Sequence, residues 1–393
     1  MLLMEIAALD WTFPACPAPP DWLVDWDALA TRFAWLRALA GVPQDAHHHA
    51  EGDVSIHTRM VVGALAADPA WRALGATERA VVFAAALLHD VAKPACTRVE
   101  VDGHITSARH ARVGATMAHA LLWEAVGLAE PVPLAIRLAI AGIVRHHGLP
   151  LWFWDKDDPI RAVLAASYAA RLDWVALVAE ADVRGRICAD QADLLDRVAL
   201  FRGYSHEQGC AAAPRSFASD HSRFVYFARA GGSPDYAAYD ATVCEVILLS
   251  GLPGAGKDTW VREQAPDWPV ISLDGLRREM GVAPTEPQGT VIHAAREQAR
   301  ELLRRQQSFI WNATNLTRAL RGQLITLFAD YGARVRIVYL DAPAAVISAR
   351  NRARAHPVPE AVIRRMVAKL EVPDGTEAHS VVYLTSNALA GTS

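Results

Sequence analysis

Apolar residues recur along the first half of the chain with the period of a helix. Between residues 57 and 200, alanine and leucine are spaced three and four positions apart, as in Glu78–Val91 and Leu172–Val183. This spacing buries one face of a helix and leaves the other face polar. We expect Thr77 to cap the first of these helices and Pro94 to stop it. Because no stretch alternates as a strand does, the pattern predicts an all-α region.

The pattern changes after Val243, where short apolar runs alternate with helical stretches. The runs that are typical of buried strands are Val246–Ser250, Val270–Leu273, Phe309–Asn312, Val335–Leu340 and Val381–Leu384. Helical spacing fills the intervals at Lys257–Gln264, Thr290–Gln307, Thr317–Tyr331, Ala344–Arg354 and Glu360–Leu370. This alternation, with fully apolar strands, predicts an α/β fold with a parallel sheet.

A segment rich in glycine and aromatic residues separates the two parts. Its glycines and a Ser-Pro pair indicate turns, and its aromatic side chains favour burial, so we expect a structured connection. The sequence therefore predicts a multidomain chain. It consists of an all-α domain over 1–202, a connecting segment over 203–242 and an α/β domain over 243–393.

Composition and charge narrow the class of protein. Hydrophobic residues make up 52% of the chain, and no apolar run reaches the roughly 18 residues of a membrane span. The N-terminus lacks the basic flank and cleavage site of a signal peptide, and the five cysteines form no CxxC pair. These features favour the cytoplasm and no membrane partner. From Val243 onward there are 18 basic and 15 acidic residues, against 21 and 28 before it, which weakly indicates an anionic substrate for the α/β part.

The segment after the first predicted strand has the spacing of a phosphate-binding loop. Gly251 is followed by four residues and then by Gly256 and Lys257. Glycines let backbone N–H groups curl around phosphate oxygens, the next helix adds its positive dipole end, and the lysine reaches the β- and γ-phosphates. The predicted nucleotide-binding residues are Gly251, Gly254, Gly256, Lys257, Asp258 and Thr259. They predict ATP or another nucleoside triphosphate, with Mg²⁺, as cofactors.

Asp258 departs from this motif, because the residue after the lysine is normally Ser or Thr, whose hydroxyl binds Mg²⁺. A carboxylate can also hold Mg²⁺, directly or through water. It adds negative charge beside the phosphates as well. This residue therefore favours the alternative of a module that senses ATP without catalysis.

Charged residues further along the α/β part are typical of phosphoryl transfer. Asp274 follows the second predicted strand, where substrate sites form in open α/β sheets, and could take a proton from a hydroxyl. Arg277 could hold a phosphate of the acceptor. Arg350 and Arg354 share one helical face and could neutralise charge over the γ-phosphate. The alternatives are that Asp274 ligates Mg²⁺ or caps a helix, and that the arginines form a solvated basic face.

The helical part carries a series of ligand-type side chains in or beside apolar segments. They are His57, His89, Asp90, Lys93, His110, His146, His147, Asp182 and Arg186. Two imidazoles with two carboxylates suit Mn²⁺, Co²⁺, Ni²⁺, Fe²⁺ or Zn²⁺, and such a metal lowers the pKa of a bound water. His110, His146 and His147 could bind phosphate or a second metal. For each histidine alone, the alternative is a core residue with satisfied hydrogen bonds.

The α/β motifs GLPGAGKDTW, SLDGLRREM, WNATN and ARNRAR with VPEAVIRRM resemble those of the polynucleotide 5'-kinase family, over about residues 243–372. The resemblance implies that Asp274 is the general base for a 5'-hydroxyl and that Arg277 contacts the acceptor's phosphate. It also implies that the two later arginines belong to a lid and that Asn312–Asn315 lie near the acceptor strand. Asp258 departs from the Ser of the phage-type motif.

The helical part resembles the HD phosphohydrolase superfamily, whose signature is His…His-Asp…Asp. The resemblance implies that the metal ligands are His57, His89, Asp90 and Asp182. HHAEGDVSIHT, LLHDVAK and AEADVRGR are similar to the HD domain of bacterial CCA-adding tRNA nucleotidyltransferases. That domain type hydrolyses 2',3'-cyclic phosphates and 2'-phosphates on RNA. The order of the two parts resembles the bacterial HD-Pnk type of RNA end-healing enzyme.

These observations and resemblances predict a bifunctional RNA end-healing enzyme. One part would phosphorylate 5'-OH ends from a nucleoside triphosphate, and the other would remove 2',3'-cyclic, 2'- or 3'-phosphates. The expected partners are RNA, or DNA, with such ends and an RNA ligase that acts downstream. The alternatives are a nucleotide or metabolite kinase fused to a nucleotide phosphohydrolase, and the ATP-sensing module without catalysis.

Overall fold

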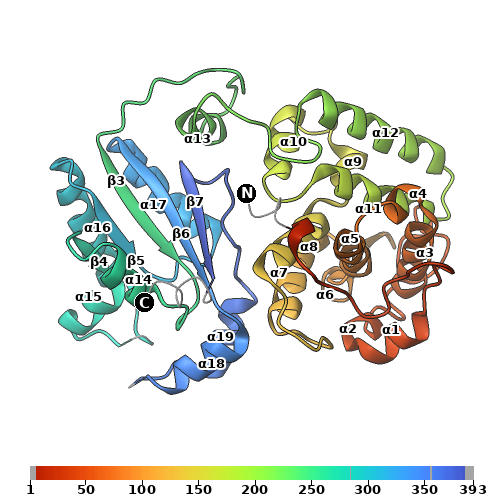
Figure 1. The fold of residues 1–393 in the computed structure, drawn as a ribbon, viewed down its shortest axis with the longest axis horizontal. Coiled ribbons are helices and arrows are strands. Elements are labelled where there is room, and N and C mark those ends of the chain that lie inside the picture. The colour runs from red at the N-terminus through yellow and green to blue at the C-terminus, as the bar shows by residue number, and fades with distance from the viewer. Residues whose placement is uncertain (1–5, 284, 355, 386–393) are drawn as a thin grey trace. The chain divides into compact units, whose positions relative to one another are not determined.

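The chain forms two compact units, Met1–Arg215 and Ser216–Ser393. The computed structural model describes residues 6–283, 285–354 and 356–385. The boundary lies within the predicted connecting segment, residues 203–242. The start of that segment continues α12 (Gln191–Glu207) of the first unit, and its middle forms α13 (Asp220–Ala228) of the second (Figure 1).

The first unit is helical, as the sequence predicts. Its longer helices, besides α12, are α3 (Val54–Ala67), α5 (Ala76–Leu88), α7 (His110–Trp123), α8 (Leu134–His146) and α11 (Leu172–Arg184). Its short helices are η2 (Ile6–Ala8), α1 (Trp26–Arg32), α2 (Ala34–Arg37), α4 (Pro69–Arg72), α6 (Lys93–Cys96), α9 (Leu149–Trp152) and α10 (Pro159–Ser167). The expectation of no strands was wrong, because β1 (Arg98–Val99) pairs antiparallel with β2 (Ile105–Thr106). Strands of two residues are too short to show an alternating pattern.

Local contacts show where α5 begins, and the two residues predicted to bound this helix do not do so. Gly75 is the N-cap, and its N–H donates to the Glu78 carboxylate at 3.1 Å. Thr77, predicted to be the cap, lies inside the helix and donates its hydroxyl to the Leu9 carbonyl at 2.7 Å. Pro94, predicted to stop the helix, instead lies in the first turn of α6, where a missing N–H costs nothing. Both capping predictions were therefore wrong.

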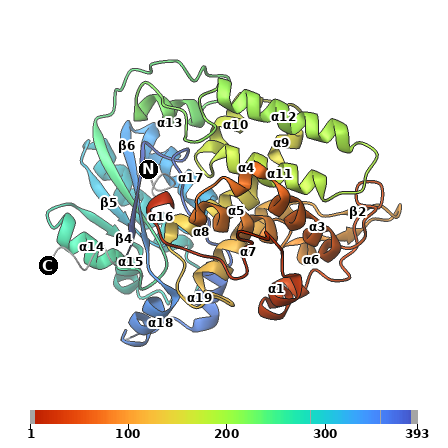
Figure 2. The ribbon, with the colours of Figure 1, turned by 45° about the vertical axis from the view of Figure 1, so that its right-hand side comes forward.

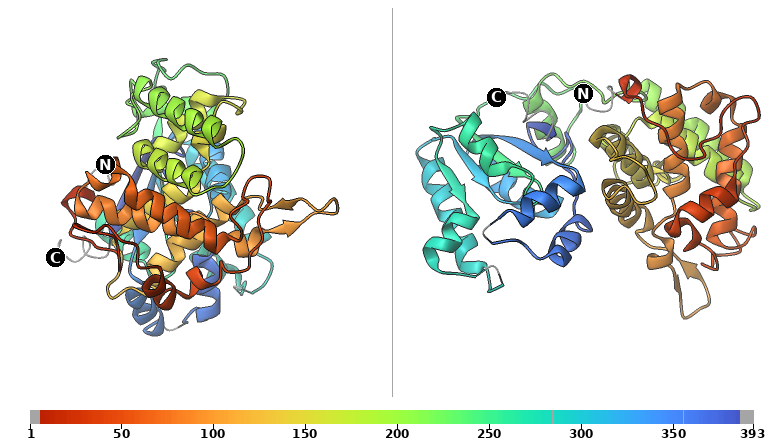
Figure 3. Two further views of the ribbon diagram at one scale, coloured as in Figure 1. Left: turned by 90° about the vertical axis from the view of Figure 1, so that its right-hand side faces the viewer. Right: turned by 60° about the horizontal axis from the view of Figure 1, so that its bottom comes forward.

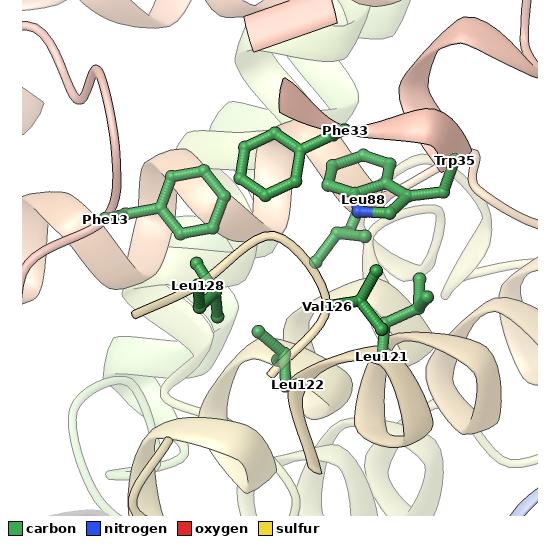
Figure 4. A pocket seen from close by; sticks show the side chains of 8 residues that line it. All are labelled: Phe13, Phe33, Trp35, Leu88, Leu121, Leu122, Val126 and Leu128. Atoms are coloured by element: carbon green, nitrogen blue, oxygen red, sulfur yellow. The ribbon is translucent and has the colours of Figure 1, made fainter. Parts of the chain in front are cut away.

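Helix α5 lies in the core of the first unit, in contact with α3, α8 and α11. Ala80–Leu88 is a continuous run of buried residues. Leu88 lines a small apolar cavity of about 10 Å³ together with Phe13 and Phe33 (Figure 4). Leu88, the last residue of α5, is therefore packed among apolar side chains directly before His89.

Among the residues that the structure describes, no single helix is long and apolar enough to cross a membrane. Helices α10 and α11 reach that length and composition only as a pair, and the pair is bent by 107°.

The second unit contains the predicted parallel sheet. Its strands are β3 (Cys244–Ser250), β4 (Val270–Ser272), β5 (Phe309–Asn312), β6 (Ala333–Asp341) and β7 (Ser380–Thr385). The order is β4-β5-β3-β6-β7, and every neighbouring pair is parallel (Figure 1, with a second view in Figure 2). The chain runs from β3 to one edge of the sheet and later passes to β6 on the other side of β3. The carboxyl end of β3 is therefore a switch point, where open α/β sheets bind ligands.

The described helices of the second unit match the five predicted ones and include two, α13 and Leu273–Met280, that were not predicted. They are α14 (Lys257–Gln264), α15 (Leu273–Met280), α16 (Gly289–Arg304), α17 (Arg318–Asp330), α18 (Ala344–Arg352) and α19 (Glu360–Val367), beside α13 (Figure 3). Helix α15 begins earlier than the strand prediction allowed. The Ser272 hydroxyl accepts the Gly275 N–H at 3.2 Å and so caps the start of α15. Leu273 and Asp274, expected at the end of a strand, therefore lie in the first turn of a helix.

Candidate active sites

The loop after β3 has the backbone shape of a phosphate cradle. Gly251, Gly254 and Gly256 have φ angles of 144°, 85° and 107°, which glycine adopts without strain. A Cβ atom on Gly251 would lie 2.5 Å from the Leu340 carbonyl oxygen, so a larger residue does not fit there. Helix α14 begins at Lys257, directly after the loop. Strand, glycine loop and helix thus follow one another as phosphate binding requires.

The Lys257 ammonium folds back on this loop. It donates to the carbonyl oxygens of Gly251 and Leu252, both at 2.9 Å. Burial lowers the pKa of the Lys257 amine to about 8, while the charges of Asp258 and Asp274 act to raise it. Phosphate oxygens form stronger, charge-assisted bonds than carbonyls. A bound polyphosphate would therefore draw the ammonium away from the loop and keep it charged.

The Asp258 carboxylate is held by the end of a neighbouring strand. Asn312, the last residue of β5 and 8% exposed, donates from Nδ2 to Asp258 Oδ1 at 2.7 Å. The hydroxyl of Thr259, the other oxygen ligand predicted here, accepts from Arg262 at 3.4 Å. Of these two predicted ligands, Asp258 therefore has the oxygen that is held more firmly beside the loop, and a carboxylate suits Mg²⁺.

Asp274 lies in the first turn of α15, where its carboxylate forms an ion pair with Arg277. The Asp274 side chain is 71% exposed. Arg277 also donates from Nε to Gln288 Oε1 at 2.5 Å, which fixes the guanidinium. Because Ser272 caps the helix, Asp274 is not its N-cap. An exposed carboxylate next to an anchored guanidinium is accessible to a substrate.

The two predicted lid arginines lie near the phosphate loop. Arg350, on α18, donates to the Gly254 carbonyl at 3.2 Å. Helix α18 ends before Arg354, so the two arginines do not share one helical face as predicted. Arg354 is close enough for its charge to lower the pKa of Lys257, after the larger effect of burial. Positive charge therefore gathers where the γ-phosphate would lie.

In the first unit, three histidines present the same ring nitrogen to Asp90. His89, His110 and His147 each donate from Nδ1 to the carbonyl oxygen three residues earlier, at 2.7–2.8 Å. Because a carbonyl only accepts, each Nδ1 carries the proton, and Nε2 of the neutral ring keeps a lone pair. The Nε2 atoms of His89 and His110 lie 3.2 and 3.4 Å from the Asp90 carboxylate. Those of His110 and His147 lie 3.3 Å apart, where two lone pairs repel unless a cation lies between them.

Asp182 completes the cluster from α11. His57 Nε2 lies 3.0 Å from Asp182 Oδ1 and 3.9 Å from Asp90 Oδ2. Lys93 Nζ is 2.8 Å from Asp90, and Arg186 binds both oxygens of Asp182 at 3.1 and 2.6 Å. Burial alone would raise the pKa of both carboxyls. The neighbouring cations and imidazoles outweigh burial and hold the pKa of Asp90 and of Asp182 well below the usual value.

These residues fit a divalent metal. Both ring nitrogens of His57, the Nε2 atom of His89 and both carboxylate oxygens of Asp90 are buried without a hydrogen bond of good geometry. Imidazole lone pairs with ionised carboxylates are the form in which ligands bind transition metals. Within the described residues, the candidate ligand groups are His57–His89–Asp90, Asp90–His110–His147 and His49–Glu51–His57. None of these groups contains His146, so His147 is the member of the predicted pair that lies in the cluster.

Sequence reasoning missed three polar residues in the loop before α3. Gln44 Oε1 accepts from Lys93 Nζ at 2.6 Å. Glu51 Oε1 lies 2.8 Å from Nδ1 of both His49 and His57. For His49 and Glu51 the only signal was their position within the HHAEGD stretch shortly before His57, and Gln44 lies outside that stretch. Nothing in that spacing shows that the loop folds back onto the cluster.

Comparisons with known proteins find two groups of relatives. A family model described as an AAA domain matches residues 246–373. The chain is 32% identical over 203 residues to the Multifunctional CCA protein of Xanthomonas euvesicatoria pv. vesicatoria (strain 85-10), covering 50% of this chain and 45% of that protein. It is 25% identical over 135 residues to the L-seryl-tRNA(Sec) kinase of Methanococcus maripaludis, covering 33% of this chain and 53% of that kinase. The chain thus spans about half the length of the curated relatives it matches.

Two solved structures of kinases are similar to part of the chain. A putative kinase from Chloroflexus aurantiacus j-10-fl has 15% identity and a TM-score of 0.33, over 39% of this chain and 91% of that one. A gluconokinase from Sinorhizobium meliloti 1021 has 20% identity and a TM-score of 0.28, over 37% of this chain and 83% of that one.

The motif geometry, the family match and the curated relatives define the class of protein. The second unit contains a P-loop that lies within the match to the AAA-domain model, and its sequence is similar to that of a kinase; a P-loop fold implies the use of a nucleotide and Mg²⁺. The similarity to CCA proteins supports an HD-like helical region in the same chain.

Proposed function

We propose that this chain is a bifunctional enzyme that heals broken RNA ends. The kinase-like unit would phosphorylate 5'-hydroxyl ends from ATP or another nucleoside triphosphate. The HD-like unit would remove 2',3'-cyclic, 2'- or 3'-phosphates. The observation that carries the proposal is the presence, in one chain, of a phosphate loop and of imidazole lone pairs around ionised carboxylates. One relative is, by its name, a kinase of a tRNA-linked acceptor, which supports RNA as the substrate.

The kinase proposal assigns a role to each charged side chain near the loop. Lys257 would turn from the loop carbonyls to the γ-phosphate, and Asp274 would accept the proton of the 5'-hydroxyl. Arg277, anchored from a second side, would hold the acceptor's phosphate. Arg350 and Arg354 would neutralise charge in the transition state. Asp258 would hold Mg²⁺ beside the loop, and the ion would neutralise charge on the phosphates.

The phosphatase proposal rests on the buried cluster. The metal ligands that we assign are His57, His89, Asp90 and Asp182, with Mn²⁺, Co²⁺, Ni²⁺ or Zn²⁺ as the candidate ions. Such an ion polarises a phosphate and lowers the pKa of a bound water. Lys93 and Arg186 bind the two carboxylates, so they would orient the ligands. His110 and His147, on the other side of Asp90, would take a second metal or the phosphate itself.

One substrate tests both halves of the proposal. An RNA with a 5'-OH and a 2',3'-cyclic phosphate is incubated with ATP, Mg²⁺ and Mn²⁺, and both ends are identified by mass spectrometry. We expect a new 5'-phosphate and loss of the 2',3'-cyclic phosphate. An RNA ligase can join the ends that result. Phosphate transfer to a mononucleoside or a metabolite but not to the RNA would instead support the small-molecule kinase. Binding of ATP without change at either end would support the sensing module. A 5'-OH DNA of the same sequence measures the preference for RNA.

The two sites are also expected to differ in metal use. Phosphates and carboxylates favour Mg²⁺, whereas imidazoles favour a transition metal. After removal of metals with a chelator, Mg²⁺ alone should restore 5'-phosphorylation and leave the cyclic phosphate intact. Full phosphate release with Mg²⁺ alone would contradict the ligand assignment.

A further inference from the structure

Glu51 occupies a fully buried position directly behind His57. Its carboxylate is 0% exposed, and Oε1 lies 2.8 Å from His57 Nδ1. The opposite ring nitrogen of His57, Nε2, faces Asp182 and Asp90. Glu51 therefore contacts one edge of the imidazole while the other edge faces the cluster.

The chemistry of these two contacts fixes the tautomer of His57. The contact between Glu51 Oε1 and His57 Nδ1 is short at 2.8 Å, although its angles depart from those of a good hydrogen bond. Two lone pairs at that distance would repel each other, so Nδ1 of His57 carries a proton towards the carboxylate oxygen. In the neutral ring, the lone pair is then on Nε2, which faces Asp182.

The other histidines of the cluster have the same tautomer but a different acceptor at Nδ1. His89, His110 and His147 each donate Nδ1–H to a carbonyl oxygen of their own helix. For His57 the acceptor is a charged side chain from another segment. A carboxylate behind a histidine raises the basicity of the ligand nitrogen more than a neutral carbonyl does. His57 is thus the one of these four imidazoles with an anionic partner at Nδ1.

We propose that Glu51 is a positioning residue that fixes the orientation and tautomer of His57 as a metal ligand. The proposal rests on the metal-dependent half of the proposed function, but it does not depend on which phosphate ester is cleaved. Glu51 acts through His57 and does not itself bind the metal.

Further contacts of Glu51 tie the loop to the helix that supplies Asp182. Glu51 Oε2 accepts the Ile187 N–H at 2.8 Å, and the Ala50 N–H donates to the Ile187 carbonyl at 3.0 Å. Ile187 comes shortly after the end of α11. His49 contacts the same carboxylate oxygen that faces His57, with Nδ1 2.8 Å from Oε1. One buried carboxylate therefore sets the distance between the segments that carry His57 and Asp182.

Metal affinity, measured on the full chain, tests this role without an assay of activity. Metal-free protein is titrated with Mn²⁺ by calorimetry for wild type, Glu51→Ala, Glu51→Gln, His49→Ala and His48→Ala. The last is the matched control, because His48 is exposed and lies in the same loop. Loss of a partner of this kind typically costs about 10- to 100-fold in metal affinity. We expect such a loss in Glu51→Ala, with an unchanged number of bound ions.

The conservative variant keeps the test valid if the alanine variant unfolds. In Glu51→Gln the amide oxygen still accepts from His57, but the charge is gone, so we expect a smaller loss of Mn²⁺ affinity at an unchanged melting temperature. Mn²⁺ affinity within about twofold of wild type in both Glu51 variants would overturn the proposal. Loss of one whole metal equivalent in Glu51→Ala and His49→Ala, with the remaining affinity intact, would also overturn it, since Glu51 would then be a direct ligand. Unchanged RNA ends with wild-type protein would count against the proposed substrate and not against this role.

Discussion

At the scale of single residues, Asp258 sets this phosphate loop apart from the usual motif. Its Oδ1 accepts a hydrogen bond from Asn312 at 2.7 Å, which leaves Oδ2 free. Asn312 ends a buried strand, so its side chain has little freedom to move. A carboxylate fixed in this way can hold Mg²⁺ beside a nucleotide without the entropy cost of ordering a free side chain.

Asn312→Ala should therefore weaken the binding of Mg·ATP and not of ATP alone. By analogy with other residues behind a metal ligand, we expect a loss of about tenfold in Mg·ATP affinity. Calorimetric titration with ATP, in the presence of Mg²⁺ and of a chelator, separates the two affinities. In an Asp258→Ser background the substitution of Asn312 should add nothing, and additive losses would show that Asn312 acts elsewhere.

Asp274 is the residue whose chemical role is easiest to separate from binding. As a general base, its replacement by Asn should lower turnover at least about a hundredfold and leave Mg·ATP affinity nearly unchanged. As a metal ligand, the same change should weaken Mg·ATP binding outright. Its 71% exposed side chain and its ion pair with Arg277 favour the first outcome. Rapid-quench kinetics and calorimetry on the same variant distinguish the two.

The sequence revealed residues whose chemistry is unusual for their surroundings. His57, His89 and Asp90 stand out because ionisable groups in apolar helices need partners, and the structure places both histidines within 4 Å of Asp90. Glu51 does not stand out, because a glutamate in a polar loop is ordinary. Its burial depends on how the loop folds against residues far away in the sequence, such as Ile187. Spacing carries no information on such a contact.

At the scale of secondary structure elements, Asn351 closes the segment between α18 and α19. Its Nδ2 donates to the Val358 carbonyl at 2.8 Å, and its Oδ1 accepts the Val358 N–H at 2.9 Å. These two bonds imitate the pairing of two strands and hold the base of the segment that carries Arg354. The position of this arginine over the phosphate loop therefore depends on Asn351.

Asn351→Ala should lower the turnover number of the kinase about tenfold or more, because misplacement of a charged group by an ångström weakens transition-state stabilisation. Mg·ATP affinity should change less, since Lys257 and the loop remain intact. Steady-state kinetics with saturating acceptor give the comparison. In an Arg354→Ala background, Asn351→Ala should have little further effect on turnover. A full additional loss there would mean that Asn351 supports the unit as a whole.

Helix α13, from the predicted connecting segment, packs on the segment before β7. The ring of Phe224 stacks on His379 with centroids 4.1 Å apart, and Arg223 donates to the Gly375 carbonyl at 2.9 Å. His379 Nδ1 accepts the Val335 N–H at 3.1 Å, so it must be unprotonated. The helix thus belongs to the second unit and covers a buried neutral histidine.

This histidine should make the second unit sensitive to acid. Burial lowers the pKa of His379 to about 4; the charges of Arg334, His221 and Arg223 also lower it, and Asp240 opposes them. Because the pKa in the unfolded chain is about 6.5, its contribution to stability is full above pH 6.5 and is lost as the pH falls towards 4. The melting temperature of the transition that Mg·ATP raises should therefore fall more between pH 7 and 4.5 in wild type than in His379→Gln. Equal slopes for the two proteins would contradict the assigned pKa.

Elements were easier to predict than their ends. The five strands were predicted because each contains a short run of apolar residues, and Phe309–Asn312 matches residue for residue. Ends depend on single hydrogen bonds, such as the Ser272 cap that draws Leu273 and Asp274 into α15. The 98–106 hairpin and α13 were missed because short elements show too few periods for a pattern to emerge.

At the scale of the whole molecule, each candidate site is built from residues of one unit alone. The phosphate loop, Asp274 and Arg350 belong to Ser216–Ser393, and the metal cluster belongs to Met1–Arg215. The hydrogen bonds described for each site join residues of the same unit. Substitutions in separate sites without shared partners usually act independently. The two proposed activities should therefore be separable within the full chain.

Lys257→Ala should abolish 5'-phosphorylation and leave the release of phosphate intact, because it removes the cation that reaches the β- and γ-phosphates. Asp90→Ala should do the reverse, because Asp90 is shared by two candidate ligand groups and its loss leaves Lys93 and His89 without their anion. Each variant is assayed at both ends of the same RNA, and its melting curve shows whether it is folded. Mixing the two variants should restore the doubly processed RNA, because each would supply the site that the other lacks. If a folded variant with one change lost both activities, or if the mixture failed to process both ends, the model of two independent sites would be wrong.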